Sequence, residues 1–518
     1  MKDTTQSVIA YAKWESGTTP EPYYDNCIIT LYNMTTEDIV DPEITFTLAE
    51  GQTPSENMNF EFHVTGNRVT GKLTDTKTIP ANQGSVSFAI GINGGSVIGP
   101  LPSGFSVNGT SADAPADSEA PSVPQDVVVS AAGAKTASLN WQPSTDNLIV
   151  VSYCVEYSDG ASVYQLSVDT NSANITGLNE KTPYTVTISA VDIAGNTSAK
   201  SAPVSFETKT PVPDPGEYNF SVAPYIDYMA YPQLTAGICY EASGIKNYTL
   251  AFIVTGTNSL DGSLMPSWGG QSDVAYDART GSLAKDDIAA LRDAGGDIAI
   301  SFGGSAGMPL EEAVKDTNTL IDWYQQIINN YALKYIDFDF EGEVLAKKDV
   351  MTRHAIVIEA VMRANPTLQV SYTLPVDGQN NPVSQGLSSY GVDFITMLAN
   401  AAIRPSMING MTMDFGYDSP ADMFTCVKYA LDALNNQIVT AWPEFTPEQA
   451  WRRMGATPMF GDNDVQGQTF TTQNQSQLLD YAKQVNLGML SGWSENRDYT
   501  MFDWAYSLII AEYQHSHS

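Results

Sequence analysis

Three carboxylates stand at every second position of one short run of the chain: Asp337, Asp339 and Glu341. Because a β-strand sends alternate side chains to opposite faces, the carboxylates would share one face and the apolar side chains between them the other. Like charges this close together raise the pKa of at least one carboxyl group. A carboxyl that stays protonated near neutral pH, beside one that stays ionised, suits acid-catalysed bond cleavage. Taken alone, the run also fits a half-exposed strand with a solvated acidic face.

The length and charge of the chain limit what it can be. At 518 residues it is too long for a single ordinary core, so we expect about three domains. Its formal net charge is -34, from 59 acidic against 25 basic residues. Such a surface repels nucleic acid and anionic lipid, and no apolar run is long enough to cross a bilayer. We therefore expect neither nucleic-acid binding nor membrane insertion.

The cysteines and histidines do not indicate a metal site. Cys27 and Cys154 each lie alone in a proposed domain, so only Cys239 and Cys426 could pair within one. Their spacing fits neither a disulfide framework nor a metal-binding knuckle, and we expect buried free thiols. The histidines also lack metal-site spacing, and none is close in sequence to the carboxylate run. We expect no metal and no cofactor.

Two stretches have the composition of linkers and divide the chain into three parts. Residues 110–121 are small, acidic and proline-bearing, and residues 210–217 hold three prolines in eight positions, which favours a stiff, extended spacer. The domains then span 1–109, 122–209 and 218–518.

The first part, 1–109, alternates polar and apolar residues in short runs separated by turns, which is typical of an all-β sandwich. Its strand rhythm, the turn at 79–84 and the closing run at 102–109 resemble a carbohydrate-binding module of the family-2 type. Such modules stack sugar rings on several tryptophans, whereas this part has only Trp14. Three tyrosines could substitute for them or could pack in the core instead: Tyr11, Tyr23 and Tyr24.

The second part, 122–209, is also all β and resembles a fibronectin type III domain over its whole length. The resemblance implies that three of its residues belong to the core and that the domain is a spacer: Trp141, Leu178 and Tyr184. The runs that carry it are 138–141, 153–157, 175–178, 184–190 and the turn at 192–196.

In the third part, 218–518, apolar strand-like runs alternate with helical patterns. This repetition favours a parallel (β/α)8 TIM barrel, in which chemistry takes place at the carboxyl ends of the strands. Glu341 lies at the carboxyl end of the fourth expected strand. Strands are expected at 248–254, 297–303, 335–340, 368–374, 407–413, 455–460 and 487–490, and helices at 286–294, 320–331, 351–364 and 475–484.

Four motifs in this part, in the right order, resemble the catalytic domain of family-18 glycoside hydrolases, the chitinase type. Asp337, Asp339 and Glu341 match the last three positions of the strand-four pattern Asp-x-x-Asp-x-Asp-x-Glu. The strand-three pattern Ser-x-Gly-Gly is matched at 301–304, and Met-x-Tyr-Asp on strand six is matched in part at 411–414. Trp493 matches the tryptophan that ends strand eight.

The resemblance implies a retaining mechanism in which the substrate's own 2-acetamido oxygen attacks the anomeric carbon, an exception among retaining glycosidases. Glu341 would protonate the leaving oxygen and later activate water. Asp339 would orient the acetamido N–H, and Asp337 would share a proton with Asp339. Trp493 would form a stacking floor for the sugar or, alternatively, a core residue that closes the barrel. Gly303 and Gly304, which we count among the substrate-binding positions, would mainly allow close backbone approach.

The sequence departs from the family pattern at two positions. Lys334 replaces the first acidic residue of the strand-four motif, out of phase with the catalytic face. Met413 replaces the tyrosine whose hydroxyl helps to hold the acetamido oxygen in the family. Tyr417 or Tyr372 could supply that hydroxyl instead, and the sequence does not decide between them.

Further positions are expected to line the substrate site. Asp414 and Met411 belong to the strand-six motif, and Trp268, after strand two, could be a platform for a sugar ring. Asn463 or Asp464, after strand seven, could face the substrate. The gap between strands seven and eight is too short for an added lid domain, so we expect an open, shallow groove and internal cleavage of chains.

The resemblance therefore predicts a chitinase acting on β-1,4-linked N-acetylglucosamine in chitin or related glycans. Two alternatives remain: an endo-β-N-acetylglucosaminidase acting on glycoproteins, and a non-catalytic adhesin that binds N-acetylglucosamine. The set of modules and the missing leader peptide suggest a secreted, extracellular protein, and we expect a monomer.

Overall fold

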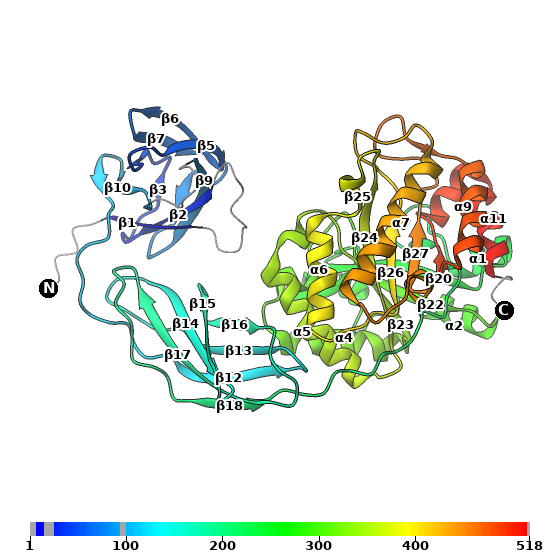
Figure 1. Cartoon of the computed structure of the whole chain (residues 1–518), viewed down its shortest axis with the longest axis horizontal. Helices are drawn as coiled ribbons and strands as arrows, with labels where there is room; N and C mark the ends of the chain where they lie inside the picture. Colours follow the sequence, from blue (N-terminus) through cyan, green and yellow to red (C-terminus); the bar gives the residue numbers. More distant parts are fainter. Residues whose placement is uncertain (1–6, 15–24, 94–99, 515–518) are drawn as a thin grey trace.

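The computed structural model describes residues 7–14, 25–93 and 100–514, which form three domains along the chain (Figure 1). Tyr23 and Tyr24, two of the tyrosines considered for sugar binding, lie outside the described residues. Within the described residues, no helix is long and apolar enough to cross a membrane.

The N-terminal domain is a sandwich of two antiparallel sheets around a buried apolar core. Thr110 and Ser111 form the last strand of the second sheet, and Ala112 is fully buried, so the domain continues past the expected boundary at residue 109. The first sheet has the order β1 (Val8–Trp14), β2 (Asp25–Asn33), β9 (Ser85–Asn93), β5 (Thr53–Met58). The second has the order β11 (Thr110–Ser111), β10 (Ser103–Val107), β4 (Ile44–Thr47), β7 (Arg68–Leu73), β6 (Phe60–Thr65), and β3 (Ile39–Val40) pairs with β8 (Thr78–Ile79).

The middle domain is a second sandwich, with sheets of three and four strands. Trp141, Leu178 and Tyr184 are buried in its core, as the sequence predicted. The smaller sheet has the order β12 (Gln125–Ala132), β13 (Ala137–Gln142), β16 (Ser172–Ile175). The larger has the order β15 (Val163–Val168), β14 (Val150–Ser158), β17 (Pro183–Asp192), β18 (Val204–Glu207).

The C-terminal domain is built on a curled sheet whose main path is parallel throughout. Every residue of the third strand on this path, Asp297–Gly303, is buried, as expected for a parallel strand covered on both faces. The path is β19 (Tyr225–Asp227), β20 (Asn247–Thr257), β22 (Asp297–Gly303), β23 (Tyr335–Asp339), β24 (Gln369–Gly378), β26 (Met407–Met411), β27 (Met454–Thr457), β30 (Met489–Leu490). Off the path, β21 (Leu264–Trp268) pairs with β20, β25 (Gln385–Leu387) with β24, and β28 (Gly461–Asp462) with β29 (Thr469–Phe470).

The last strand of this sheet is hydrogen-bonded to the chain beside the first. The Leu490 N–H donates to the Ser221 carbonyl at 2.9 Å, and the Ala223 N–H donates to the Leu490 carbonyl at 3.1 Å. Two residues further on, the Tyr225 N–H donates to the Gly492 carbonyl at 3.0 Å. These bonds bring the two ends of the curled sheet together.

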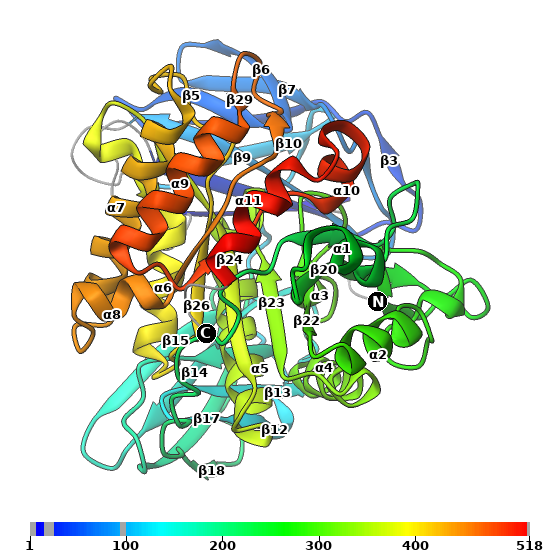
Figure 2. The same cartoon turned by 90° about the vertical axis from the view of Figure 1, so that its right-hand side faces the viewer.

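Helices cover the outer face of the sheet, with α6, α7 and α9 on one side and α1 and α2 on the other (Figure 2). Several begin at a side-chain cap, as at Asp316, which accepts a hydrogen bond from the Thr319 N–H at the start of α4. The helices are α1 (Ala236–Ser243), α2 (Lys285–Asp293), α3 (Leu310–Ala313), α4 (Thr317–Tyr331), α5 (Lys348–Ala364), α6 (Ser389–Asn400), α7 (Met423–Ala441), α8 (Pro447–Arg452), α9 (Thr472–Val485), α10 (Glu495–Arg497) and α11 (Ala505–Gln514). Short turns are η1 (Val274–Tyr276), η2 (Gly342–Ala346), η3 (Pro382–Ser384) and η4 (Asp498–Phe502).

Candidate active site

Asp337 lies deepest of the three carboxylates, inside the curl of the sheet, and is held by hydroxyl groups. Ser301 and Tyr225 donate to its Oδ2 at 2.7 and 2.8 Å, and Thr373 donates to its Oδ1 at 2.9 Å. Ser371 donates to the same Oδ1. Burial raises the pKa of Asp337, although each of these hydroxyls stabilises the ionised form and acts in the opposite direction.

Asp339 follows on the same face of β23 but has no comparable support. Its Oδ1 is buried without a hydrogen-bond partner. Burial, the neighbouring carboxyl of Glu341 and then Asp337 together raise the pKa of Asp339 well above its ordinary value. A buried polar atom that lacks a partner is costly, so this oxygen is suited to bind a group that enters the site.

A glycine on the neighbouring strand allows β23 to come close to β22 at this level. Gly303 has φ of 111°, and a Cβ atom there would lie 2.1 Å from the backbone oxygen of Asp339. At Gly304, with φ of 90°, a Cβ atom would lie 2.7 Å from the ring of Phe252. Both positions therefore need glycine for backbone conformation and for space.

Glu341 stands just past the end of β23, half-buried, where two cavities meet. Its pKa is raised to about 7, first by burial and then by the charges of Asp414 and Asp464. A carboxyl with this pKa is protonated in about half of the molecules at neutral pH, so it can act as an acid and, once ionised, as a base.

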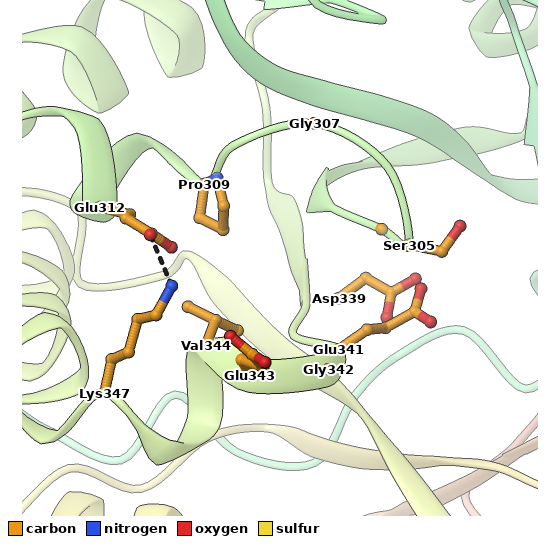
Figure 3. Close-up of a pocket in the computed structure, with 11 residues that line it drawn as sticks. Ser305, Gly307, Pro309, Glu312, Asp339, Glu341, Gly342, Glu343, Val344 and Lys347 are labelled. Atoms are coloured by element: carbon orange, nitrogen blue, oxygen red, sulfur yellow. Dashed lines mark hydrogen bonds and ion pairs between the residues drawn. The ribbon is translucent and has the colours of Figure 1, made fainter. Parts of the chain in front are cut away.

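The first cavity, called here the acidic cavity, has a volume of about 310 Å³. Figure 3 shows the carboxyl groups of Asp339 and Glu341 side by side at its edge. On the opposite side, Lys347 pairs with Glu312 at 2.6 Å (Figure 3). Its walls are formed by Gly304, Ser305, Gly307, Pro309, Glu312, Asp339, Glu341, Gly342, Glu343, Val344 and Lys347.

The second cavity, called here the hairpin cavity, has a volume of about 510 Å³ and takes one wall from the β24–β25 hairpin. Glu341 belongs to both cavities, so a chain-like ligand passing from one to the other would cross it. The walls are formed by Glu341, Pro375, Val376, Asp377, Gln379, Val383, Ser384, Gln385, Gly386, Leu387, Ser388, Ser389, Met411, Met413 and Asp414.

Three positions of the strand-six motif lie together at one cavity. Met411, Met413 and Asp414 all line the hairpin cavity. Asp414 is fixed in position because its N–H donates to Asn463 Oδ1 at 3.0 Å and its Oδ1 accepts from the Val465 N–H at 2.9 Å.

Asn463, expected to face the substrate, is used within the protein instead. Its Oδ1 accepts from the Asp414 N–H, and its Nδ2 donates to the carbonyls of Met459 and Gly461 at 3.4 and 3.2 Å. Asn463 therefore supports the loop that carries Asp414. Asp464 remains a candidate because its charge raises the pKa of Glu341.

Neither tyrosine considered as a substitute for the family hydroxyl lies in a cavity. Tyr372 faces away from the carboxylates, and its hydroxyl bonds His354 Nε2 at 2.9 Å behind the strand. Tyr417 is fully exposed and lines neither cavity. The prediction that Tyr372 supplies the hydroxyl was therefore wrong. The structure does not bring Tyr417 to the site either.

Trp268 was expected to be a sugar platform, and this expectation was wrong. It is fully buried, and its indole N–H donates to the Tyr331 hydroxyl at 3.0 Å. The sequence places Trp268 after a strand, whereas it lies within β21, a strand that folds back on β20 and buries the ring.

Trp493 follows β30 and is half-buried. Its ring stacks on Phe252 with centroids 5.5 Å apart and meets Tyr225 edge-on at 5.9 Å. Tyr225 is also the residue that donates to Asp337, so the ring of Trp493 lies close to the carboxylate network. The sugar-stacking role of Trp493 stays a prediction.

Lys334 is exposed and pairs with Asp297 at 3.2 Å, away from the catalytic face. Sequence reasoning placed one donor to Asp337, Ser301, in the strand-three motif but missed the donors from β19 and β24. Ser371 and Thr373 could have been found, because polar residues alternate with apolar ones along β24, and register pairs them with Asp337 and Asp339. Tyr225 gave no such signal, because its strand has only three residues.

Other groups that could bind ions or form cross-links lie away from Glu341. The four cysteines are free; Cys154 is half-buried and the others are buried. Among the described residues, one group of three carboxylates offers oxygens within 4.8 Å of one another: Asp117, Asp146 and Asp192. It belongs to the middle domain and the segment before it.

Comparison with known proteins gives results for two parts of the chain. Residues 122–207 match the family model of the fibronectin type III domain. The chain is 29% identical over 290 residues to a probable bifunctional chitinase/lysozyme of Escherichia coli, covering 53% of this chain and 30% of that protein. It is 29% identical over 291 residues to endochitinase 11 of Metarhizium anisopliae, covering 53% and 52%.

Among solved structures, the catalytic domain of a hyperthermophilic chitinase from Pyrococcus furiosus is 28% identical. The match covers 59% of this chain and 97% of that one, with a TM-score of 0.49. The chain thus spans about half or less of the length of the two curated relatives.

Proposed function

We propose that this chain, whose C-terminal domain is related to the family-18 chitinases and whose middle domain is a fibronectin type III domain, is a chitinase. It would hydrolyse β-1,4 bonds between N-acetylglucosamine units in chitin or related glycans. The observation that carries the proposal is Glu341, a carboxyl with a pKa of about 7 at the meeting point of two cavities, beside the buried Asp339. The similarity to two chitinases supports the substrate class.

Glu341 would act first as acid and then as base. It would donate its proton to the glycosidic oxygen as the acetamido oxygen of the same sugar attacks the anomeric carbon, and the leaving chain departs as an alcohol. The product of this step is a cyclic oxazolinium ion. Glu341, now ionised, would take a proton from the water that opens the ring, which regenerates the acid and retains the anomeric configuration.

Asp339 would hold the acetamido group. Its buried Oδ1 lacks a partner in the protein and would accept the acetamido N–H, which aims the acetamido oxygen at the anomeric carbon. Asp337, anchored by four hydroxyl donors, would stay fixed beneath it and share a proton with it as charge develops. Donors and charges fixed before reaction are usually the largest catalytic contribution.

The curled sheet would be a closed (β/α)8 barrel, and its groove would be open. The hydrogen bonds between Leu490 and the chain at Ser221 and Ala223 support closure. The segment between β27 and β30 contains only the β28–β29 hairpin and α9, and two cavities lie on either side of Glu341, which supports internal cleavage of chains. We expect secretion, because the presumed polymer is insoluble and extracellular.

The test compares wild type with Glu341→Gln on chito-oligosaccharides that carry a chromogenic leaving group. Loss of a general acid is expected to lower kcat by roughly 10²-fold or more. Glu343→Gln is the matched control, because this exposed carboxyl lines the same cavity and should leave kcat nearly unchanged. Equal activity of wild type and Glu341→Gln would refute the assignment, and binding without turnover by wild type would favour the adhesin.

A further inference from the structure

A buried carboxylate near the end of α5 joins the catalytic domain to the fibronectin type III domain. Glu359 is 1% exposed, and its Oε1 accepts from the Ala134 N–H at 2.7 Å. Its Oε2 accepts from the Thr136 hydroxyl at 3.2 Å. Arg363, one turn later, pairs with Glu359 at 2.7 Å and also donates to the Thr210 carbonyl at 2.7 Å. Because a buried charge is tolerated only with partners, these bonds are features of a specific interface.

The facing turn of the fibronectin type III domain is shaped for this carboxylate. At Gly133 a Cβ atom would lie 1.8 Å from Glu359 Oε2, although the backbone there is outside the left-handed region. The same Cβ atom would lie 2.5 Å from Thr136 Oγ1, so the lack of space at Gly133 comes from the partner carboxylate first and from its own turn second. Nearby, the hydroxyls of Ser130 and Thr317 bond at 3.2 Å, and Thr317 is 1% exposed at the start of α4.

The segment 210–217, expected to be a stiff, extended spacer, is fixed to the catalytic domain. Val212 is buried in the core of that domain. Arg453 pairs with Asp214 at 2.7 Å, and Arg452 pairs with Glu217 at 2.7 Å. The Gln369 amide donates to the Glu217 carbonyl at 2.6 Å. The segment therefore follows the surface of the catalytic domain instead of acting as a free tether.

The N-terminal sandwich in turn contacts the fibronectin type III domain. Lys13 pairs with Asp169, and Tyr32 and Gln83 share a cavity of about 300 Å³ with the loop at 144–150. In Figure 1 this sandwich lies in the upper part of the view, as β25 does on the opposite side, and in Figure 2 it lies at the top, where β29 also lies. The hairpins β24–β25 and β28–β29 follow the carboxyl ends of parallel strands, so this end also carries Glu341.

We infer that the fibronectin type III domain is a rigid bracket, docked through Glu359, that holds the N-terminal sandwich level with the face that carries Glu341. In this position both domains contact one surface of an insoluble polymer. The polymer contact rests on the proposed function, whereas the docking does not. When one domain binds the polymer, the other domain meets it at a high effective concentration only if the two domains are held in the right relative position.

The test uses the full chain with Gly133→Val, whose side chain would meet Glu359 Oε2 across the interface and Thr136 Oγ1 in its own turn. Ala161→Val is the matched control, since Ala161 is exposed on a turn of the same domain. Glu359→Ala removes the same bonds from the catalytic side and replaces Gly133→Val if that variant does not fold. Small-angle X-ray scattering measures the radius of gyration, and hydrolysis is followed on soluble chromogenic oligosaccharides and on insoluble chitin.

Wild type and Ala161→Val should scatter as the docked arrangement, and Gly133→Val and Glu359→Ala should show a larger radius of gyration. Hydrolysis of the soluble substrate should stay the same in all four, while hydrolysis of insoluble chitin falls several-fold in the two undocked variants. Identical scattering of wild type and both undocked variants would overturn the docking. Changed scattering with unchanged chitin hydrolysis would overturn the contact with polymer. If wild type cleaves neither substrate, the proposed function fails, and scattering still decides the docking.

Discussion

The charge of Asp414 should control the pH at which activity is lost on the alkaline side. The pKa of Glu341 rises from 4.5 to about 7, with burial as the largest cause, Asp414 as the second and Asp464 as the third. Asp414 therefore accounts for less than half of the rise, or about one pH unit at most. The substitution Asp414→Asn removes this charge. It also keeps an oxygen that can accept from the Val465 N–H and suits the left-handed backbone at this position, where φ is 51°.

The sign follows from the role of Glu341 as an acid. The protonated form is active, so kcat/KM is full below the pKa and falls as pH rises through about 7. Without the charge of Asp414 the proton is held less tightly, and the pKa of Glu341 falls. The alkaline limb of the profile should therefore move to lower pH by up to about one unit, which corresponds to about 1.4 kcal/mol.

The assay is kcat/KM for a chromogenic chito-oligosaccharide measured over roughly pH 4 to 9, a range that covers the ionisation of the acid. Asp462→Asn is the control. It likewise removes one carboxylate, an exposed one in β28, and Asp462 is not among the causes that raise the pKa of Glu341. The alkaline limb of the pH profile of Asp462→Asn should coincide with that of wild type. A limb that stays in place in Asp414→Asn, or moves to higher pH, would refute the electrostatic argument.

Two further predictions concern buried residues. Trp268→Ala should destabilise the protein by about 3–5 kcal/mol and lower Tm, because it leaves a cavity in the core. The control Tyr417→Ala should change stability by less than about 0.5 kcal/mol. If Trp268→Ala raised KM and left Tm unchanged, Trp268 would be a sugar platform after all. Glu495 is buried, and burial raises its pKa from 4.5 to about 8, so its contribution to stability is full below about pH 4.5 and is lost as pH rises from there through about 8. Glu495→Gln should therefore lose less Tm than wild type between about pH 5 and 8, and equal losses would contradict this.

The sequence predicted every strand on the parallel path of the C-terminal domain except the first, and it predicted the helices α2, α4, α5 and α9. The expected strand at 297–303 coincides with β22, and the expected helix at 320–331 lies within α4. The first strand, Tyr225–Asp227, was not predicted because three residues give no readable alternation. The helix Met423–Ala441 was also missed, although it has 19 residues.

Site residues could be predicted where they follow one another along a single strand. They could not be predicted where their role depends on residues of other strands. The alternation of Asp337, Asp339 and Glu341 with Phe338 and Phe340 is local, and the structure buries the phenylalanines as expected. The error at Trp268 has a different cause. Whether an aromatic ring faces a groove or the core depends on how a hairpin folds back, which a single strand pattern does not encode.

The three carboxylates differ because the supply of hydrogen-bond donors falls along β23. Asp337 receives four hydroxyl donors, so its negative charge is supported even though it is buried. Asp339 has a buried oxygen with no donor and carries the strongly raised pKa. Glu341 stands at the open end, where burial and then the charges of Asp414 and Asp464 raise its pKa to about 7. One strand thus places a carboxyl anchored by hydroxyl donors, a carboxyl with a buried oxygen that needs a ligand, and a titratable acid in sequence, although their residue types are nearly the same. Moving hydroxyl donors from the position of Asp337 to that of Asp339 or Glu341 should therefore change which carboxyl plays which role. Exchanging the carboxyl side chains themselves should have a smaller effect.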